Sequence, residues 1–399
     1  MLLARSLVAL SAIATVAVPA HAQTQWTVDD DGPADFSSIS EAIPLVAPGD
    51  ILLVAPGLYS GFHLDKALVI LGDPSERPEI SGPCSIVGAD YFVLSQLKIF
   101  AGSLRVTAIP GRSSIHSCLV LQTLAEIDGA SELVIQSSEF QGENGVGGGQ
   151  VGKDALHING ASKVNINQST ITGGLAANPS FPCMEWEHLF AGDSVLVSGA
   201  SELSLVECDL NGGSIWHCAG PFHGPGTPGS PLTIRDQSTV VWRDSGDAGL
   251  NWTYNVTVEP EAELIWSSPT QPHPIVGLKA VSNPPLPALH LAGSAAPGGQ
   301  QTVELHADPA TAGVLFISTD PAWIESSDLY GADIWLALNG GTAIVPIQPT
   351  GIGTPATFSW TSPDDPAFSG FTATCQAGVL NLVDYSWAAT NPVEVLVGY

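Results

Sequence analysis

A sequence repeat of about twenty residues occurs three times in succession. It reads AEIDGASELVIQSSEFQG from Ala125, ALHINGASKVNINQSTITGG from Ala155 and SVLVSGASELSLVECDLNGG from Ser194. Each copy has an alternating apolar and polar run, then Gly-Ala-Ser, then a second alternating run that ends beside a glycine. Such repetition is typical of an array in which each unit buries its apolar face only against its neighbours. We therefore expect a solenoid of stacked parallel strands.

Aligning the copies on Gly129, Gly160 and Gly199 brings residues of one kind into columns. Alternation of apolar and polar residues is the period of a strand with one buried face. Strands stacked in register lie about 4.8 Å apart, so the charged column would form an outward ladder of ion pairs. The apolar columns are Leu133 with Val164 and Leu203, Ile135 with Ile166 and Leu205, and Phe140 with Ile171 and Leu210; the small column is Ser138, Ser169 and Cys208; the charged column is Glu132, Lys163 and Glu202.

The start of the chain carries a family resemblance. Asp35-Phe36-Ser37-Ser38-Ile39 with Glu41-Ala42-Ile43, followed by Pro48-Gly49-Asp50 and Gly57-Leu58-Tyr59, is similar to the opening of pectin-lyase-like proteins. The match covers about residues 26–60, and the repeats extend it to about residue 268. The resemblance implies a right-handed parallel β-helix. Ser38 and Glu41 form a capping box that predicts a short helix ending near Val46, which would cover the open end of the solenoid.

Composition restricts the partners and the compartment. Lys and Arg total 11 against 39 Asp and Glu, a formal charge of -28, which argues against binding to nucleic acid or an anionic membrane. Residues 1–22 have the pattern of a secretory signal peptide, with Arg5, an apolar centre and the small residues Ala20 and Ala22 around the cleavage site. No later run is long enough for a membrane span. We expect an exported protein of the periplasm, the cell surface or the extracellular medium.

The expected domain organisation follows from the repeats and from the Pro- and Gly-rich stretches that interrupt the strand pattern. Residues 23–281 are predicted to form the β-helix, residues 282–301 a Pro- and Gly-rich linker, and residues 302–399 a small β-sandwich-like domain. The predicted strands of that domain are 302–306, 314–318, 334–338, 343–347, 357–360, 371–377 and 393–397. The fold class is therefore all-β throughout.

Six cysteines in an exported chain raise the question of disulfides. Cys118 and Cys208 fall in one strand column three rungs apart, about 14 Å by strand spacing, which is too far for a bond. We expect them to be buried small residues. Cys183 and Cys218 lie in loops that leave adjacent rungs, so we predict a disulfide between them. The pattern assigns no partner to the two remaining cysteines, Cys84 and Cys375.

Long loops interrupt the rungs at one corner only, at residues 143–153, 175–192 and 214–230. Stacked rungs stack their loops, and long loops on a rigid scaffold often carry function. The second loop contains Glu185, Trp186, Glu187 and His188, and the third contains Trp216, His217 and His223. Tryptophans stack on sugars and paired carboxylates hydrolyse glycosidic bonds, which would make this corner a carbohydrate site. The alternative is that both tryptophans fold inward as loop anchors. The histidines could also suggest a zinc site, but their spacing in the sequence does not match the usual spacing of zinc ligands.

Asp154 and Asp193 align one rung apart, each just before a strand. Stacked carboxylates repel each other and need a donor or a cation, so Ca²⁺ is one candidate partner. Lys153 is a simpler partner, and capping of nearby backbone N–H groups is simpler still.

The resemblance does not extend to a known active site. Ser60 and Gly61 follow Tyr59 where methylesterases have an acidic residue, and the later Gln-Asp and Asp-Phe signatures are missing. The expected function is a non-catalytic glycan-binding or cell-surface structural protein, whose partner is a polysaccharide or cell-envelope glycan. The alternative is a carbohydrate-active enzyme, a polysaccharide lyase or glycoside hydrolase, acting through Glu185, Glu187 or Asp154. In a third interpretation the sandwich docks a surface-assembly module to the cell envelope.

Overall fold

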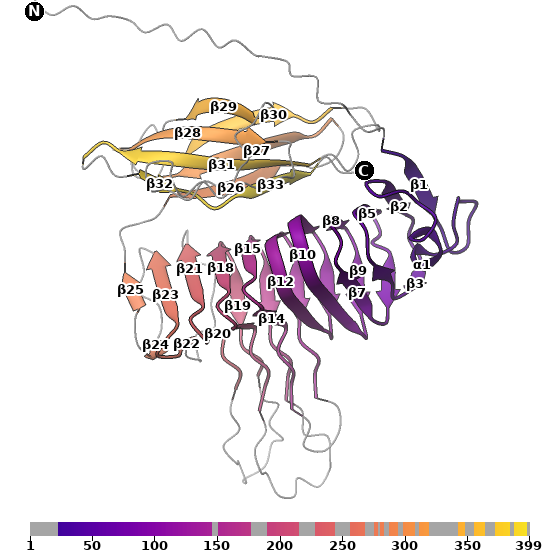
Figure 1. Cartoon of the computed structure of the whole chain (residues 1–399), viewed down its shortest axis with the longest axis horizontal. Helices are drawn as coiled ribbons and strands as arrows, with labels where there is room; N and C mark the ends of the chain where they lie inside the picture. Colours follow the sequence, from indigo (N-terminus) through magenta and orange to yellow (C-terminus); the bar gives the residue numbers. More distant parts are fainter. Residues whose placement is uncertain are drawn as a thin grey trace, which may run out of the picture.

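The chain is nearly all β, with large parallel sheets followed by antiparallel sheets (Figure 1). The structure is a computed structural model. It describes residues 23–145, 151–176, 190–214, 228–243, 256–267, 275–277, 280–282, 287–293, 298–307, 311–318, 342–347, 355–363, 372–383 and 387–396. The signal-peptide expectation for residues 1–22 lies outside these ranges. No helix among the described residues is long and apolar enough to cross a membrane.

The parallel strands pair as three ladders, together called the parallel stack. Ladder 1 contains β1 (Gln25–Val28), β2 (Ile51–Val54), β5 (Leu68–Gly72), β8 (Phe92–Ser95), β10 (Ser103–His116), β12 (Leu124–Gln136), β15 (Lys163–Asn167), β18 (Glu202–Val206), β21 (Thr239–Arg243), β23 (Glu263–Ser267) and β25 (Ala280–Ser282). Ladder 2 contains β4 (His63–Leu64), β7 (Cys84–Val87), the first parts of β10 and β12, β14 (Leu156–Asn159), β17 (Val195–Val197), β20 (Leu232–Ile234), β22 (Val256–Val258) and β24 (Ile275–Gly277). Ladder 3 contains β3 (Leu58–Ser60), β6 (Glu79–Ser81), β9 (Lys98–Phe100), β11 (Leu119–Leu121), β13 (Glu139–Gln141), β16 (Thr170–Thr172) and β19 (Asp209–Asn211).

Each rung of the stack contributes one strand to ladder 2, then one to ladder 1 and then one to ladder 3, as β14, β15 and β16 do. Because β10 and β12 run through the corner between ladders 2 and 1, these two ladders form one 18-stranded sheet, while ladder 3 is a 7-stranded sheet. This arrangement is compatible with a parallel β-helix.

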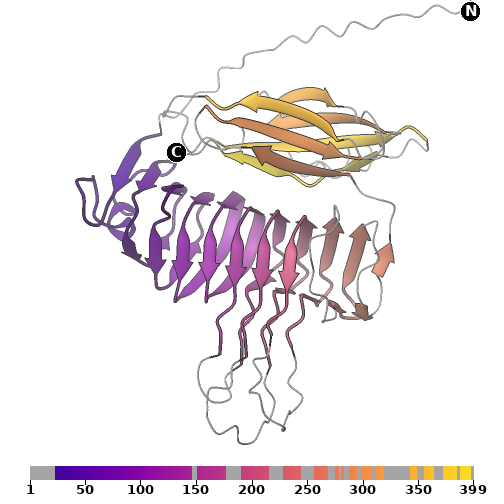
Figure 2. The same cartoon turned by 180° about the vertical axis from the view of Figure 1, so that it is seen from behind.

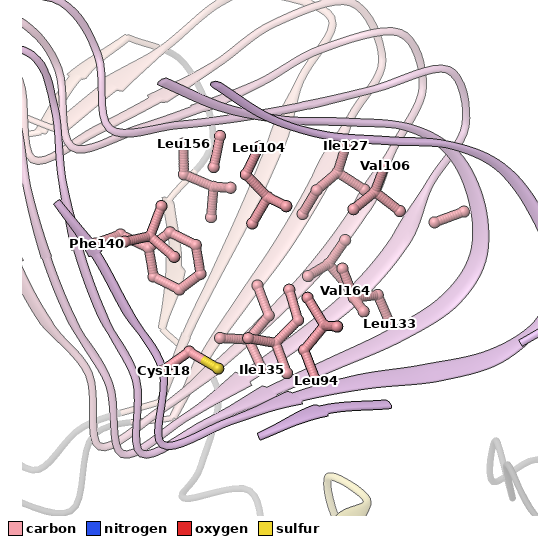
Figure 3. Close-up of a cluster of buried hydrophobic side chains, with 14 of the residues drawn as sticks. Leu94, Leu104, Val106, Cys118, Ile127, Leu133, Ile135, Phe140, Leu156 and Val164 are labelled. Atoms are coloured by element: carbon pink, nitrogen blue, oxygen red, sulfur yellow. The ribbon is translucent and has the colours of Figure 1, made fainter. Parts of the chain in front are cut away.

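The register confirms the apolar columns of the repeats. Leu133 pairs with Val164 and Val164 with Leu203, and the columns that begin at Ile135 and Phe140 pair in the same way. These side chains are buried in one core that runs from Val28 to Leu264. Figure 3 shows four of them, Leu133, Ile135, Phe140 and Val164, pointing into the space that the ladders enclose. Each rung therefore buries its apolar side chains against the rungs on either side.

Buried serines close the corners between the ladders. At the corner between ladders 1 and 3, the hydroxyl of Ser138 accepts the N–H of Cys118 at 3.1 Å, and the hydroxyl of Ser169 accepts that of Ser138 at 3.1 Å. At the corner between ladders 2 and 1, the hydroxyl of Ser201 accepts the N–H of Ser162 at 3.2 Å. One side chain thus satisfies a backbone donor of the neighbouring rung where strand pairing is interrupted.

The Gly-Ala-Ser motif does not form the same corner in every copy. In the second and third copies both Gly and Ala are left-handed, with φ of 67° and 56° at Gly160 and Ala161, and the serine is buried. In the first copy Ala130 takes the buried position and Ser131 is exposed. The strand β12 continues through this corner, which places Ser131 outside the core.

The column of charged side chains, Glu132, Lys163 and Glu202, does not face solvent along its whole length. Lys163 and Glu202 form the expected pair, with Nζ and Oε2 3.6 Å apart. Glu132 is instead buried, with 1% of its surface exposed, and its charged neighbour in the previous rung is Arg112, whose Nε lies 3.8 Å from Oε1. The expectation of a solvated column was wrong at Glu132 because the antiparallel sheets cover this part of ladder 1.

The capping helix is present and shorter than expected. Helix α1 spans Ile39–Ala42, and the Ser38 hydroxyl accepts the N–H of Glu41 at 3.2 Å. The Glu41 carboxylate bonds to the N–H and hydroxyl of Ser37 instead of returning to Ser38. The buried side chains of Ile39 and Ala42 join the end of the stack core.

Antiparallel strands follow the stack and have a core of their own. One sheet contains β26 (Ala288–Gly293), β27 (Gln300–His306) and β30 (Ala356–Thr361); the other contains β28 (Thr311–Ser318), β29 (Thr342–Ile347), β31 (Thr372–Asn381), β32 (Trp387–Ala389) and β33 (Val393–Leu396). Strand β26 lies inside the range expected to be a linker and pairs with β27. The predicted strand at 334–338 lies outside the described residues.

The antiparallel sheets lie along the parallel stack, on the side of ladder 1 (Figures 1 and 2). Leu396 packs into a small apolar cluster with Ile51, Val69, Leu71 and Val93 of the stack. Further along ladder 1 the contacts are polar, and Asn391 donates to the Asn167 side-chain oxygen at 3.2 Å. The outward face of ladder 1 is therefore buried against the sheets in part, whereas Glu202 on β18 stays exposed.

The serine corners give a first testable prediction. Ser162→Ala removes the acceptor of the buried Ala130 N–H, which Ser162 Oγ holds at 3.1 Å. An unpaired buried donor costs about 1–3 kcal/mol, so the free energy of unfolding in urea should fall by that amount. Ser131→Ala is the matched control, because the same motif leaves this serine exposed. Equal unfolding free energies of the two variants would contradict the proposed role of the buried hydroxyl.

Candidate functional site

The described stems of the three long loops leave the parallel stack together, on the side away from the antiparallel sheets (Figures 1 and 2). The predicted site residues Glu185, Trp186, Glu187, His188, Trp216 and His217, and the predicted disulfide partners Cys183 and Cys218, lie outside the described residues. The described parts are the stems of the loops, at residues 143–145, 151–153, 175–176, 190–192, 214 and 228–230.

Backbone hydrogen bonds join the stems into one row, here called the stem bundle. Lys153 N donates to Glu143 O at 2.9 Å, and Gly174 N donates to Lys153 O at 2.8 Å. The row continues from Gly192 N to Gly174 O at 3.0 Å, from Gly213 N to Gly192 O at 2.8 Å, and from Gly229 N to Gly213 O at 3.0 Å. Both ends of each loop therefore belong to the same hydrogen-bonded layer.

Glycine is required in the stem bundle because the chains lie too close for a side chain. A Cβ on Gly213 would lie 2.1 Å from the carbonyl oxygen of Gly174, and one on Gly229 would lie 1.8 Å from that of Gly192. Real Cβ atoms do not approach an oxygen so closely, so only hydrogen fits at these positions. The glycines that end each repeat in the sequence are thus explained by packing between rungs.

Asp154 and Asp193 both cap backbone N–H groups of the next rung. Asp154 Oδ1 accepts the N–H of Asp193 at 2.6 Å, and Asp193 Oδ1 accepts the N–H of Ser230 at 2.6 Å. The second oxygens are also engaged, Asp154 Oδ2 with His157 Nε2 at 2.6 Å and Asp193 Oδ2 with the Thr233 hydroxyl at 2.7 Å. The sequence left three possible partners for these two carboxylates, namely Ca²⁺, Lys153 and nearby backbone N–H groups. The structure favours the backbone N–H groups.

Burial raises the pKa of Asp193, and the neighbouring Asp154 charge adds to the rise, while the bonds from Thr233 and Ser230 oppose it. Lys153, the other partner considered, pairs with Glu143 instead. Each of the four carboxylate oxygens of Asp154 and Asp193 therefore has a hydrogen-bond partner within the protein.

His157 is a site residue that the sequence did not predict. It lies on β14 beside Asp154, and both side chains are partly exposed. Its neighbour in the previous rung is Glu126, which pairs with Arg105, so titratable groups of three rungs share the outward face of ladder 2. The available signal was that Asp154 lies three residues before His157, just ahead of β14. An aspartate that orients a histidine is an arrangement suited to proton transfer.

One group of acidic residues among the described ones is close enough to share a metal ion, namely Asp29, Asp30 and Asp31. Two of these carboxylates also act as caps. Asp29 Oδ1 accepts the N–H of Gly32 at 3.0 Å, and Asp30 Oδ2 accepts the N–H of Leu58 at 3.1 Å. Asp29 thus stabilises the turn after β1, and Asp30 joins that turn to β3.

The described cysteines are free and buried. Cys118 and Cys208 occupy the expected column, and Cys84 and Cys375 are likewise unpaired. Burial raises the pKa of Cys118, Cys208 and Cys375 to about 12 and that of Cys84 to about 11. The thiols therefore stay protonated and act as small apolar side chains.

No protein-family model matches the chain, and no curated protein matches it.

The stem bundle gives a second prediction. Gly213→Ala places a methyl group 2.1 Å from the Gly174 carbonyl oxygen, so the stems must separate. We expect the free energy of unfolding to fall by about 1–3 kcal/mol, the usual cost of overpacking, as measured by urea denaturation. Ser214→Ala is the control, since its side chain is exposed at the next position of the same stem. A Gly213→Ala protein as stable as this control would contradict the close packing.

The aspartate caps give a third prediction. Asp193→Ala leaves the Ser230 N–H without the acceptor that it has at 2.6 Å, and should lower the free energy of unfolding by about 1–3 kcal/mol. Asp193→Asn keeps one amide oxygen as an acceptor and should cost less. Added Ca²⁺ should not change the melting temperature of the wild type or of either variant. A Ca²⁺-dependent rise in the wild type that Asp193→Ala abolishes would show that the pair holds a metal.

Proposed function

We propose that the chain is an exported, right-handed parallel β-helix protein of the pectin-lyase-like kind with a C-terminal β-sandwich-like domain. Three parallel ladders in register, a capping helix and the opening motif of residues 26–60 support this assignment. The signal-peptide pattern of residues 1–22 supports export to the periplasm, the cell surface or the medium.

We further propose that the protein binds a polysaccharide or a cell-envelope glycan without cleaving it, or serves as a structural element of the cell surface. The observation that carries this proposal is the stem bundle, whose backbone bonds bring both ends of all three loops into one layer. Two of these loops contain Trp186 and Trp216, and the amphipathic ring of tryptophan stacks well on a sugar. Loops held at both ends by a rigid scaffold are well placed to bind a ligand.

The missing methylesterase signatures favour binding over catalysis. Asp154, the candidate acid or base that lies among the described residues, accepts the N–H of Asp193 at 2.6 Å and so has a capping role. Binding that depends on aromatic stacking needs no free carboxylate. The acidic surface of the chain fits a neutral glycan better than a polyanionic one, since like charges repel.

A carbohydrate-active enzyme, either a glycoside hydrolase or a polysaccharide lyase, is the second candidate. The observation that favours it is the contact of 2.6 Å between Asp154 Oδ2 and His157 Nε2 on an accessible face, with Glu126 and Arg105 on neighbouring rungs. Such a pair is able to accept or donate a proton. Glu185 and Glu187 remain the candidates on the second loop.

A glycan panel read for binding and for product release separates the two functions. We expect binding without product release, and Trp186→Ala or Trp216→Ala should weaken it by about tenfold or more, which corresponds to about 1.4 kcal/mol. Phe substitutions at the same positions should keep much of the affinity, because they retain an aromatic face. Release of products that is lost in Glu185→Gln, Glu187→Gln or Asp154→Asn would instead establish an enzyme. Absence of binding to every glycan would overturn both glycan binding and the enzyme candidate, and would leave the structural role.

A further inference from the structure

Buried polar contacts join the antiparallel sheets to ladder 1. Asn167 Nδ2 donates to Pro392 O at 3.2 Å, and Glu394 N donates to Gln136 Oε1 at 3.3 Å. His116 Nε2 lies 3.4 Å from Glu394 Oε2, with 7% and 6% of the two side chains exposed. We call these residues, with Arg112 and Glu132, the clasp.

Glu132 is the unusual member of the clasp. It is 1% exposed, and neither of its carboxylate oxygens has a hydrogen-bond partner among the described residues. Arg112 Nε is 3.8 Å away, which is longer than a hydrogen bond. A buried carboxylate ion without hydrogen bonds is strongly unfavourable, whereas a protonated carboxyl is much less so.

Three neighbouring strands place a charged or titratable group near Glu132. Arg112 on β10 and Lys163 on β15 are cations, and Glu394 on β33 is a second carboxyl group. His116 faces Glu394, and Cys375 on β31 lies near Arg112 with its thiol protonated. Glu132 and Glu394 thus share a buried region with the cation Arg112.

The two carboxyl groups differ in protonation. Burial raises the pKa of Glu132 to about 8, against the influence of Arg112 and with that of Glu394. Burial also acts to raise the pKa of Glu394, but the His116 hydrogen bond and the Arg112 charge outweigh it and leave the pKa below its ordinary value. At neutral pH the docked clasp therefore holds Glu132 as the acid and Glu394 as the carboxylate.

We propose that docking of the antiparallel sheets onto ladder 1 takes up a proton on Glu132, so that the clasp loosens as the pH rises. When the clasp opens, water reaches Glu132 and its carboxyl group gives a proton to solvent. When it closes, the carboxylate takes one proton back from solvent. No other reactant is needed. The proposal concerns the junction of the two parts of the chain and is independent of glycan binding at the loops.

The direction of the effect follows from the sign of the shift. Because Glu132 has a higher pKa in the docked state, its contribution to docking is complete below the ordinary value of 4.5 and is lost as the pH rises towards about 8. Glu394 acts in the opposite sense, but its lowered pKa confines that effect to more acidic solution. Across the neutral range the clasp should therefore respond to Glu132, and comparison with a Glu132 variant removes the effect of the histidines.

Hydrogen exchange of the Glu394 amide tests the clasp in the full chain, because this N–H donates to Gln136 across the contact. We compare the wild type with Glu132→Gln, which resembles the protonated acid, at the same pH so that chemical exchange cancels. The ratio of wild-type to variant protection should fall by about tenfold for each pH unit between 4.5 and about 8, and then level off. Glu139→Gln, on the exposed side of β13, should match the wild type at every pH.

A constant ratio across this range would overturn the proposal. Infrared spectroscopy supplies a second reading that does not depend on the opening rate. The wild type at neutral pH should show a protonated-carboxyl band that Glu132→Gln lacks. Identical spectra would show that Glu132 is ionised in the docked state, and would also overturn the proposal.

Discussion

A stack of short parallel rungs must satisfy the backbone N–H groups at its corners, where the strands stop pairing. A buried donor left without an acceptor costs free energy at every rung, so the cost would grow with the length of the stack. In this chain the acceptor is a side chain of the adjacent rung: Ser162 and Ser201 at one corner, Ser138 and Ser169 at the next. Asp154 does the same at the loop corner.

The same constraint shapes the region where the loops depart. The stems continue the stacking beyond the ladders, but they do so with backbone against backbone, as between Gly213 and Gly192. This spacing leaves no room for side chains between the stems. The function proposed for the loops depends on this row, because it determines where the loops begin and end.

The contact between the outward face of ladder 1 and the antiparallel sheets is unusually polar. A face that a second domain covers is usually apolar, as in the cluster of Leu396 with Val69 and Val93. Here much of the contact is made by buried amides and titratable groups such as Asn167, Glu132 and Glu394. Buried polar groups gain little net stability but are sensitive to any change of charge. That sensitivity makes the junction a candidate for control by solution conditions.

The sequence by itself determined the all-β class, the register of the apolar columns and the corner from which the loops leave. These features repeat with the rungs, and a periodic pattern records them directly, as in the column of Leu133, Val164 and Leu203. It also identified Asp154 and Asp193 as partners in adjacent rungs, with backbone capping among the possible roles.

Only the tertiary structure decided how those residues are used. Glu132 has the pattern of an exposed residue, and it is buried because a strand more than two hundred residues later in the chain, β33, lies beside it. Ser131 and Ser162 belong to the same motif but have opposite burial, because β12 continues through the corner that Ser162 closes. Local sequence specifies the strand period, whereas burial and protonation depend on which distant segment packs against a face, and this information is not contained in the repeat.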